Sequence, residues 1–309
     1  MKDTMLVAHW YAPEEVKAMA DYVGDSLGLV QAVQDEKPKR LIFAGVRFMA
    51  ETAKIMLPDT DVIIPDYNAT CSLVTQTNVN SLEHWVNWNR DAEARWGRDT
   101  THIMYINSSV EMKALADIIV TSANVVDIIK AEIDKGKRIL FTPDYNMGRY
   151  IMNTFDTEMK LWSSLCDVHD GFNLESLEQE MRGWTDGNKY LLAHPESQFE
   201  ILDKADFVGS TNSMLQWIKD FPHKVGTIWV ATEEGLLHDM RRARPELDIR
   251  PAMGYKGCQC NQCPYMKMNT RAAVNTALMG VGGRAINYIS DELAEAARKP
   301  IERMLEFGK

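Results

Sequence analysis

The sequence lacks any run of about eighteen apolar residues, the length that a membrane-spanning helix needs. Its first residues, MKDTMLVAHWY, lack the charged, apolar and cleavage-site regions of a signal peptide. No linker or low-complexity tract interrupts the chain. We therefore expect a soluble, cytoplasmic protein that has no membrane partner.

Cysteine is scarce, with five residues in 309, at positions 71, 166, 258, 260 and 263. An odd number at uneven spacing disfavours the disulfide framework of a secreted protein and is typical of a reducing compartment. Basic residues are in deficit, because 34 Lys and Arg face 44 Asp and Glu, for a net charge of −10. This balance disfavours nonspecific binding to nucleic acid, and an anionic substrate must be held by local groups.

A threefold repeat is the most informative feature that the sequence does contain. Each copy contains a polar residue, then a hydroxyl residue seventeen positions later in the sequence, and then a cysteine. The members are His9, Ser26 and Cys71, then Tyr105, Ser122 and Cys166, then His194, Thr211 and Cys263. A period of roughly ninety residues indicates three copies of one supersecondary unit.

Each copy also repeats one pattern of secondary structure. Short apolar strands are expected at 5–8, 103–106 and 190–193, helical stretches at 13–22, 112–116 and 199–205, and second strands ending in YVGDS, IVTSAN and FVGST. Third strands read RLIFAGV, RILFTPDYN and GTIWVATEEG, and a fourth is clearest in DVIIPDYNATC. Further helical segments are expected at 81–96, 174–184 and 289–307. Short buried strands that alternate with helices are typical of parallel α/β sheets.

We therefore predict an α/β fold of three homologous three-layer αβα domains with short parallel sheets, at 1–98, 99–187 and 188–285. A helical region at 286–309 is expected to pack back on the body. Such folds bind ligands at the carboxyl ends of their strands. The serine and threonine residues of the repeat fall where the next helix begins, and a helix start binds phosphate or carboxylate without Lys or Arg.

The cysteines have more than one interpretation at this stage. The run GCQCNQCP suits a zinc knuckle, a dithiol redox pair or part of an iron-sulfur site, and any single buried cysteine can be a small hydrophobe. A zinc site in this run leaves Cys71 and Cys166 unexplained. One thiolate from each copy instead suits a 4Fe-4S cluster with one open iron. Cys258 and Cys260 are then spare thiols or a redox-sensitive pair.

Several histidines and a glutamate fall at equivalent strand ends or beside a proposed cluster ligand. They are His9, His194 and His169, with Glu196 two residues after His194 and therefore on the same side of the chain. A carboxylate in that place can take a proton from a carbon next to a carbonyl. The alternative is that each histidine is structural.

Tyr11, Tyr105 and Asn107 complete the candidates at the strand ends. A tyrosine can donate to a developing enolate or hold a carboxylate, and Asn107 can hydrogen-bond a carboxylate or an imine. The alternatives are an aromatic residue at the edge of the core and a polar residue that caps a strand.

Many stretches together resemble the quinolinate synthase family over nearly the whole chain. They are AHWY, YVGDSL, GVRFMAETAKIM, ATCSL, YINSSVEMKALAD, VTSAN, PDYNMGRY, CDVH, AHPE, ADFVGST, TEEG, CPYMKMNT and PIERMLEF. The resemblance implies condensation of dihydroxyacetone phosphate with iminoaspartate (iminosuccinate) to quinolinate, with loss of phosphate and two waters, in NAD biosynthesis. It also implies a pseudo-threefold arrangement of the domains around a central, oxygen-sensitive 4Fe-4S cluster.

The resemblance further implies roles for individual residues. The cluster ligands are Cys71, Cys166 and Cys263, the last selected by CPYMKMN, and the open iron acts as a Lewis acid in dehydration. Substrate-binding residues are His9, Ser26, Tyr105, Asn107, Ser122, His194, Glu196, Ser210 and Thr211. Glu196 and Tyr11 are the preferred acid/base pair, supported by His169, His194 and Tyr105. An aspartate-oxidising enzyme is expected to supply iminoaspartate.

Two functions from other classes remain open at this stage. A noncatalytic iron-sulfur protein in electron transfer or redox sensing predicts four protein ligands and a surface for an electron partner. A metal-free α/β module that binds a small diacid predicts no iron at all. Both leave part of the repeat unexplained.

Overall fold

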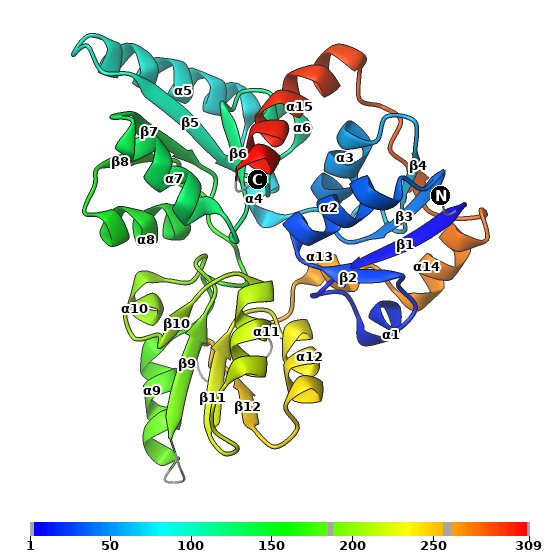
Figure 1. The fold of residues 1–309 in the computed structure, drawn as a ribbon, viewed down its shortest axis with the longest axis vertical. Coiled ribbons are helices and arrows are strands. Elements are labelled where there is room, and N and C mark those ends of the chain that lie inside the picture. Colours follow the sequence, from blue (N-terminus) through cyan, green and yellow to red (C-terminus); the bar gives the residue numbers. More distant parts are fainter. Residues whose placement is uncertain (1–2, 185–187, 256–260, 308–309) are drawn as a thin grey trace.

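The computed structural model describes residues 3–184, 188–255 and 261–307 and contains three β-sheets with helices around them (Figure 1). In each sheet the first four strands of the unit lie in the spatial order fourth, third, first, second, and all of them are parallel. The predicted α/β fold of three αβα units with short parallel sheets is confirmed.

The elements follow the repeat. The first unit contains β1 (Thr4–His9), α1 (Glu14–Lys17), β2 (Tyr22–Gly24), α2 (Ser26–Glu36), β3 (Arg40–Ala44), α3 (Arg47–Met56), β4 (Asp61–Ile64) and α4 (Ser72–Thr75). Helix α5 (Val79–Ala94) follows in the chain and packs against the second sheet. The second unit contains β5 (Thr100–Tyr105), α6 (Val110–Lys113), β6 (Ile118–Val120), α7 (Val125–Asp134), β7 (Arg138–Thr142), α8 (Tyr145–Phe155) and β8 (Met159–Leu161). Helix α9 (Leu174–Gly183) follows in the chain and packs its Leu177 in the core of the third unit. The third contains β9 (Lys189–Ala193), α10 (Phe199–Leu202), β10 (Phe207–Val208), α11 (Thr211–Asp220), β11 (Thr227–Ala231), α12 (Gly235–Ala243) and β12 (Asp248–Pro251).

The helix between the first and second strands is a single turn in every unit. The range 13–22 predicted for the first of these helices is wrong, because α1 ends at Lys17 and Tyr22 already lies in β2. The cause is an aspartate that follows the helix in each unit and bonds one residue in the middle of the first strand. Its carboxylate accepts the backbone N–H of that residue at 2.7 or 2.8 Å, and its own backbone N–H donates to the carbonyl of the same residue. The three pairs are Asp21 with Leu6, Asp117 with His102, and Asp206 with Leu191.

These short helices also join each unit to another. Lys17, at the end of α1, donates to the carbonyl of Gly235 at 2.8 Å and forms a buried ion pair with Asp239 of α12. Lys113, at the end of α6, lies 5.1 Å from the ring of Phe48 in α3, and α10 packs against α8. The first unit therefore contacts the third, the second the first, and the third the second, so that the units close a ring.

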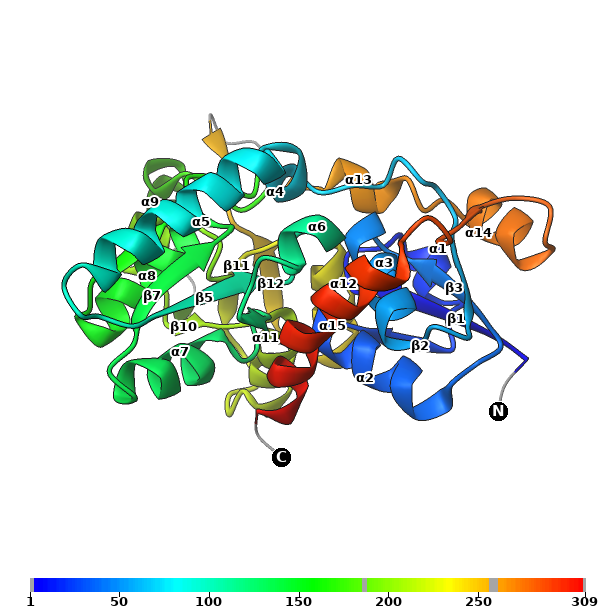
Figure 2. The same ribbon diagram turned by 90° about the horizontal axis from the view of Figure 1, so that it is seen from above.

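The last part of the chain returns to the first unit. After α13 (Pro264–Lys267), α14 (Arg271–Leu278) packs against β3, and β13 (Arg284–Ala285) pairs antiparallel with β4. Figure 2 shows these orange segments beside the blue first unit. Helix α15 (Asp291–Glu306) runs through Pro300 and packs against β6, α6 and α3. The domain boundaries at residues 98, 187 and 285 stay a prediction.

Lys113 is fully buried, and its amine donates to the carbonyl of Ser108. Burial lowers the pKa of Lys113 from its usual value to about 7. In the unfolded chain the pKa of this amine is about 10.4. Between these two pH values the unfolded chain therefore binds more protons than the folded protein, and the free energy of unfolding rises with pH.

We expect Lys113→Met to remove this part of the pH dependence. Between pH 7 and pH 10 the free energy of unfolding should rise by a few kcal/mol less in the variant than in the unsubstituted protein, since each pKa unit corresponds to about 1.4 kcal/mol. Anaerobic urea unfolding at several pH values measures the slope. Lys130→Met, at an exposed lysine of α7, should leave it unchanged; equal slopes for all three proteins contradict the prediction.

Candidate active site

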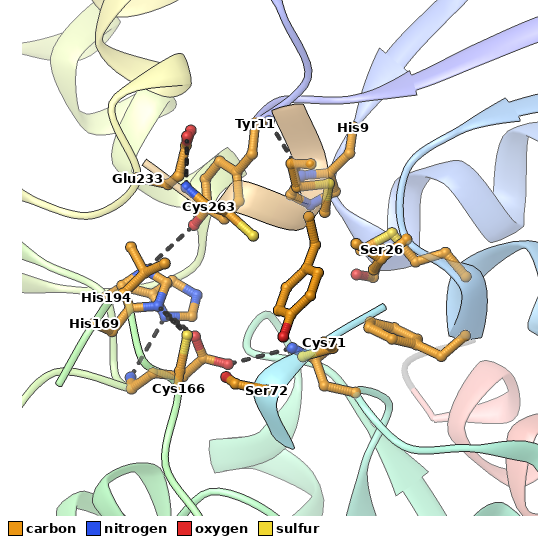
Figure 3. Close-up of a pocket in the computed structure, with 18 of the residues that line it drawn as sticks. His9, Tyr11, Ser26, Cys71, Ser72, Cys166, His169, His194, Glu233 and Cys263 are labelled. Carbon is orange, nitrogen blue, oxygen red and sulfur yellow. Dashed lines mark hydrogen bonds and ion pairs between the residues drawn. The ribbon is translucent and has the colours of Figure 1, made fainter. Parts of the chain in front are cut away.

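One cavity lies where the carboxyl ends of the strands of all three units meet (Figure 3). Thirteen of the fourteen predicted site residues line it: His9, Tyr11, Ser26, Cys71, Tyr105, Asn107, Ser122, Cys166, His169, His194, Glu196, Thr211 and Cys263. The remaining one, Ser210, is not among the lining residues. Its hydroxyl accepts the backbone N–H of Ser213 at 3.2 Å and caps α11. Cys258 and Cys260 lie outside the described residues.

The repeat explains how the polar residues reach the cavity. His9 and Tyr105 end β1 and β5, and His194 directly follows β9. Each is followed two positions later, in the turn or bend after the strand, by another lining residue. The structure thus brings together three pairs, which are His9 with Tyr11, Tyr105 with Asn107, and His194 with Glu196.

The hydroxyl residues lie at or near helix starts. Ser26 and Thr211 are the first residues of α2 and α11, and Ser122 lies two positions before Asn124, the N-cap of α7. The first backbone N–H groups of a helix have no partner within the helix and carry partial positive charge. This arrangement supplies binding groups for an anion from all three units.

The histidines at the ends of the first strands are held by backbone N–H groups. The Nδ1 atom of His9 accepts the backbone N–H of Tyr11 at 3.2 Å, and Nδ1 of His194 accepts that of Glu196 at 3.4 Å. Burial lowers the pKa of both imidazoles to about 3. Both rings are therefore neutral near pH 7, and the contact of His9 with Tyr11 places the proton of His9 on Nε2.

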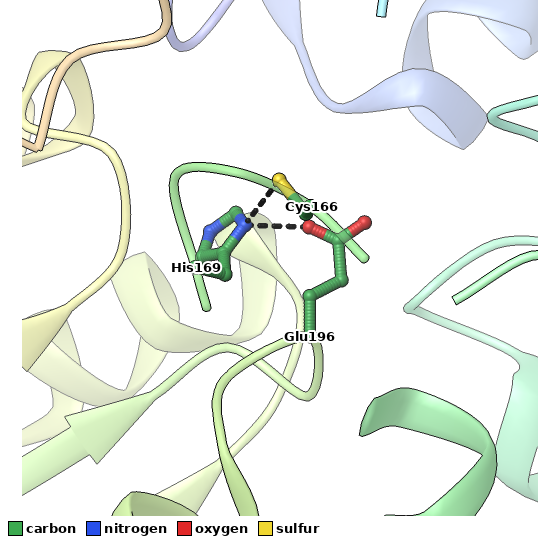
Figure 4. Close-up of side chains that lie close together, drawn as sticks. All are labelled: Cys166, His169 and Glu196. Atoms are coloured by element: carbon green, nitrogen blue, oxygen red, sulfur yellow. Dashed lines mark hydrogen bonds and ion pairs between the residues drawn. The ribbon is translucent and has the colours of Figure 1, made fainter. Parts of the chain in front are cut away.

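A hydrogen-bond network joins Glu196 to Tyr11. Oε2 of Glu196 lies 2.6 Å from Nδ1 of His169, and this nitrogen is also 3.2 Å from the Cys166 sulfur (Figure 4). Nε2 of His169 is 3.1 Å from the Thr232 hydroxyl and 3.5 Å from the Tyr11 hydroxyl. The two hydroxyls are 2.8 Å apart. A proton can therefore pass between Glu196 and Tyr11 through one imidazole.

The charge states of this network follow from burial and from its contacts. Burial raises the pKa of Tyr11 and of Tyr105 well above the usual range, so both remain phenols that can donate. Burial alone would raise the pKa of Glu196 as well, but the contact with the His169 imidazole, 2.6 Å away, outweighs it and lowers this pKa to about 2. Glu196 is therefore a carboxylate that can accept a proton.

Asn107 lies on the other side of the same carboxylate. Its Nδ2 atom donates to Oε1 of Glu196 at 3.4 Å, and Tyr105 also forms a hydrogen bond with Glu196. Within the described part of the chain, the buried Oδ1 atom of Asn107 has no hydrogen-bond partner. A buried acceptor without a partner is costly, which indicates that a donor on a ligand satisfies it.

The three predicted cluster cysteines are free thiols that line this cavity, and Figure 3 shows their sulfurs turned into it. Burial is the main cause that raises the pKa of Cys71, Cys166 and Cys263, the last to about 11. Thiolates here require a compensating cation. Within residues 3–184, 188–255 and 261–307, only Cys166, His169 and Glu196 come close enough together to share one metal ion.

Sequence reasoning missed Thr232 and Glu233, which directly follow β11. Thr232 joins Tyr11 to His169, and Glu233 lines the cavity. The signal was present in TEEG, which occupies the same place after the third strand as PDYN in the second unit. The equivalent stretch of the first unit places Val46, Phe48 and Met49 on the cavity wall and makes that wall apolar.

Comparison with known proteins identifies the family. The sequence profile described as "Quinolinate synthetase A protein" matches residues 1–306. The chain belongs to the quinolinate synthase family. The quinolinate synthase of Cyanophora paradoxa is 36% identical over 306 residues, which cover 99% of this chain and 88% of the relative. That of Chloroherpeton thalassium is 37% identical over 308 residues, which cover 99% and 91%.

Family membership confirms what the resemblance predicted about function: the chain is an enzyme, a quinolinate synthase of NAD biosynthesis. It also decides against the noncatalytic iron-sulfur protein and the metal-free binding module. No helix in the described ranges is long and apolar enough to span a membrane.

Proposed function

We propose that this cavity condenses dihydroxyacetone phosphate with iminoaspartate to quinolinate, with loss of phosphate and two waters. One observation carries the proposal, which is that three kinds of group face the same cavity. They are a carboxylate linked through an imidazole to a buried phenol, three free thiols, and helix starts from all three units. Together these groups can hold two small anionic substrates and move protons between them.

We propose that Cys71, Cys166 and Cys263 hold a 4Fe-4S cluster with one open iron. The donor set fits such a group, because each iron of a cluster takes its own thiolate, so three thiols that line one cavity need not converge on a single ion. When bound, the cluster supplies Lewis-acid chemistry for the two dehydrations and requires no net electron transfer. The chain's own residues bind the substrates and move the protons.

The carboxylates of iminoaspartate are assigned to the strand ends and helix starts. The ring N–H groups of neutral His9 and His194 and the phenol of Tyr105 are donors, and so are Ser26, Ser122 and Thr211 with their backbone N–H groups. The Oδ1 atom of Asn107 accepts the imine N–H. Ser210 acts indirectly, because its hydroxyl caps the helix that carries Thr211. This donor set supplies the local anion-binding groups that a protein with a net charge of −10 needs in order to hold an anionic substrate.

Proton transfer at the triose carbons is assigned to Glu196 and Tyr11. Glu196 is ionised and therefore takes a proton from carbon, while Tyr11 is protonated and donates to a developing enolate or leaving oxygen. His169 lies between them and returns the proton by way of Thr232. His194 stacks on His169, with 4.4 Å between ring centres, and restricts its orientation.

Iminoaspartate is an unstable imine in water, so a supply from an aspartate-oxidising enzyme in the same compartment fits this reaction. We place that compartment in the cytoplasm, since the three described cysteines, Cys71, Cys166 and Cys263, are unpaired and an iron-sulfur cluster needs reducing conditions. Neither nucleic acid nor membrane has a role in the proposal.

Quinolinate formation tests the proposed function. Under anaerobic conditions, the purified brown protein should form quinolinate from dihydroxyacetone phosphate and iminoaspartate and release phosphate in equal amount. The protein should contain about four irons per chain. Boiled protein and each substrate alone serve as controls. Iron-loaded protein that forms no quinolinate contradicts the proposed reaction.

A further inference from the structure

Two positions after the third strand, the three units carry equivalent residues that differ in chemistry. Two residues after β3, β7 and β11 lie Val46, Asp144 and Glu233 respectively. Val46 lines the cavity with an apolar side chain. The other two are acidic and almost completely buried, with exposed fractions of 1% and 0%. Buried carboxyl groups are rare unless they have a defined set of partners.

Asp144 connects a helix start to one cysteine. Its Oδ1 atom accepts the backbone N–H of Met147 at 2.7 Å and caps α8, while its Oδ2 atom accepts the backbone N–H of Cys166 at 3.2 Å. The backbone of Asp144 has φ 78° and ψ 100°, in the left-handed half of conformational space that a residue with a Cβ atom rarely adopts. Such strain persists only where the surrounding contacts fix it.

Glu233 makes the corresponding connection in the third unit. Its Oε1 atom accepts the backbone N–H of Cys263 at 3.2 Å and the amine of Lys267 at 2.7 Å, while Oε2 accepts the backbone N–H of Gly235 at 2.6 Å. Lys267 also donates to the carbonyl of Tyr11 at 2.9 Å. One carboxyl group therefore fixes the cysteine, the start of α12 and the loop that carries Tyr11.

The Cys71 segment is held differently. Its neighbour Ser72 accepts the backbone N–H of Asp167 at 3.1 Å through its hydroxyl, and Gln76 accepts that of Leu165 at 2.9 Å. These bonds tie α4 to the loop on both sides of Cys166. All of these bonds use the backbone N–H of a cysteine or of a residue next to one, and none uses a sulfur atom. The sulfurs therefore remain turned into the cavity.

We propose that Asp144 and Glu233 are positioning residues that fix the main chain of Cys166 and Cys263 and so hold these thiolates ready for the cluster. The inference rests on the proposed cluster ligands. Groups that orient metal ligands typically change metal affinity by about 10- to 100-fold when they are removed. Neither carboxyl group touches the reacting atoms in this account, and each acts through the cysteine that it holds.

The test compares Asp144→Asn and Glu233→Gln in the anaerobically prepared, iron-loaded protein. Both changes keep the shape of the side chain but leave one acceptor oxygen where two are used, and asparagine tolerates the left-handed backbone of position 144 better than most residues. We expect iron release to a ferrous chelator to be about 10- to 100-fold faster in either variant. The electron paramagnetic resonance line shape of the reduced cluster should also change.

Matched controls separate positioning from a general loss of stability. Asn173→Ala removes an equivalent helix cap at α9 that has no bond to a cysteine. Glu234→Gln changes the neighbouring carboxylate, which bonds the side chain of Gln262. Both controls should release iron at the rate of the unsubstituted protein and keep its line shape.

Three outcomes overturn a part of this account. If Asp144→Asn and Glu233→Gln both fold and release iron within twofold of the unsubstituted rate, the positioning role is wrong. Faster release that Asn173→Ala reproduces equally assigns the effect to helix capping and also contradicts it. An unsubstituted protein that takes up no iron instead contradicts the cluster assignment under Proposed function, so the two failures are distinguishable.

Discussion

Glu196→Gln is expected to lower the turnover number for quinolinate formation by about 10²- to 10⁴-fold, the range that a general base usually contributes. The variant should fold normally, because glutamine has the same shape and its single carbonyl oxygen can still accept from His169, so that only the long 3.4 Å bond from Asn107 loses its acceptor. What it loses is the negative charge that takes a proton from carbon. A carboxylate whose pKa is lowered to about 2 is already ionised at any pH at which the protein is assayed.

Three measurements on this variant separate chemistry from binding and from cluster loss. Iron content should match the unsubstituted protein, because Glu196 is not a proposed ligand. Addition of a small diacid should still perturb the spectrum of the cluster, whereas quinolinate formation should fall. Glu200→Gln, at an exposed glutamate of α10, is the matched control and should keep full activity. Normal turnover in Glu196→Gln removes this residue from the mechanism.

Replacement of any one of the three cavity cysteines by serine is expected to abolish both the cluster and the activity. Serine is a poor ligand because its hydroxyl remains protonated where a thiol ionises. Two remaining thiolates leave two of the four irons without a protein sulfur, and among the described residues this cavity offers no other thiol. Iron per chain should fall below about one tenth of the unsubstituted value in Cys71→Ser, Cys166→Ser and Cys263→Ser.

The other two cysteines are the natural controls for this series. Cys258→Ser and Cys260→Ser should retain iron and form quinolinate, because the proposal assigns neither to the cluster. Iron is measured by colorimetric assay after anaerobic purification, together with absorbance of the bound cluster. A full complement of iron in Cys263→Ser would falsify its assignment and would direct attention to the neighbouring thiols.

The repeat made much of the fold predictable from the sequence. Equal spacing between His9 and Ser26, Tyr105 and Ser122, and His194 and Thr211 implied equal units, and a parallel sheet places strand ends at one edge. The nine residues of the repeat, all of which line the cavity, therefore followed from periodicity. The length of α1 did not, because the pairing of Asp21 with Leu6 is a contact between segments rather than a local preference.

The hydrogen-bond network was beyond sequence reasoning for a physical reason. His169, Glu196, Tyr11 and Thr232 come from all three units, and no spacing along the chain predicts that a glutamate oxygen lies 2.6 Å from an imidazole 27 positions away in the sequence. Ser210 shows that a residue in a predicted site position can have a purely structural role. Its place beside Thr211 suggested a ligand group, but its hydroxyl is used to begin the helix.

The return of the chain to its first unit has a consequence for biosynthesis. Strand β4 keeps an exposed edge until β13 pairs with it, and Cys263 comes almost two hundred positions after Cys71. A ribosome has therefore released nearly all of the protein before the first sheet is complete and before the last cysteine can reach the other two. If Cys71, Cys166 and Cys263 hold the cluster as proposed, we expect cluster assembly to follow the synthesis of Cys263 and therefore of most of the chain.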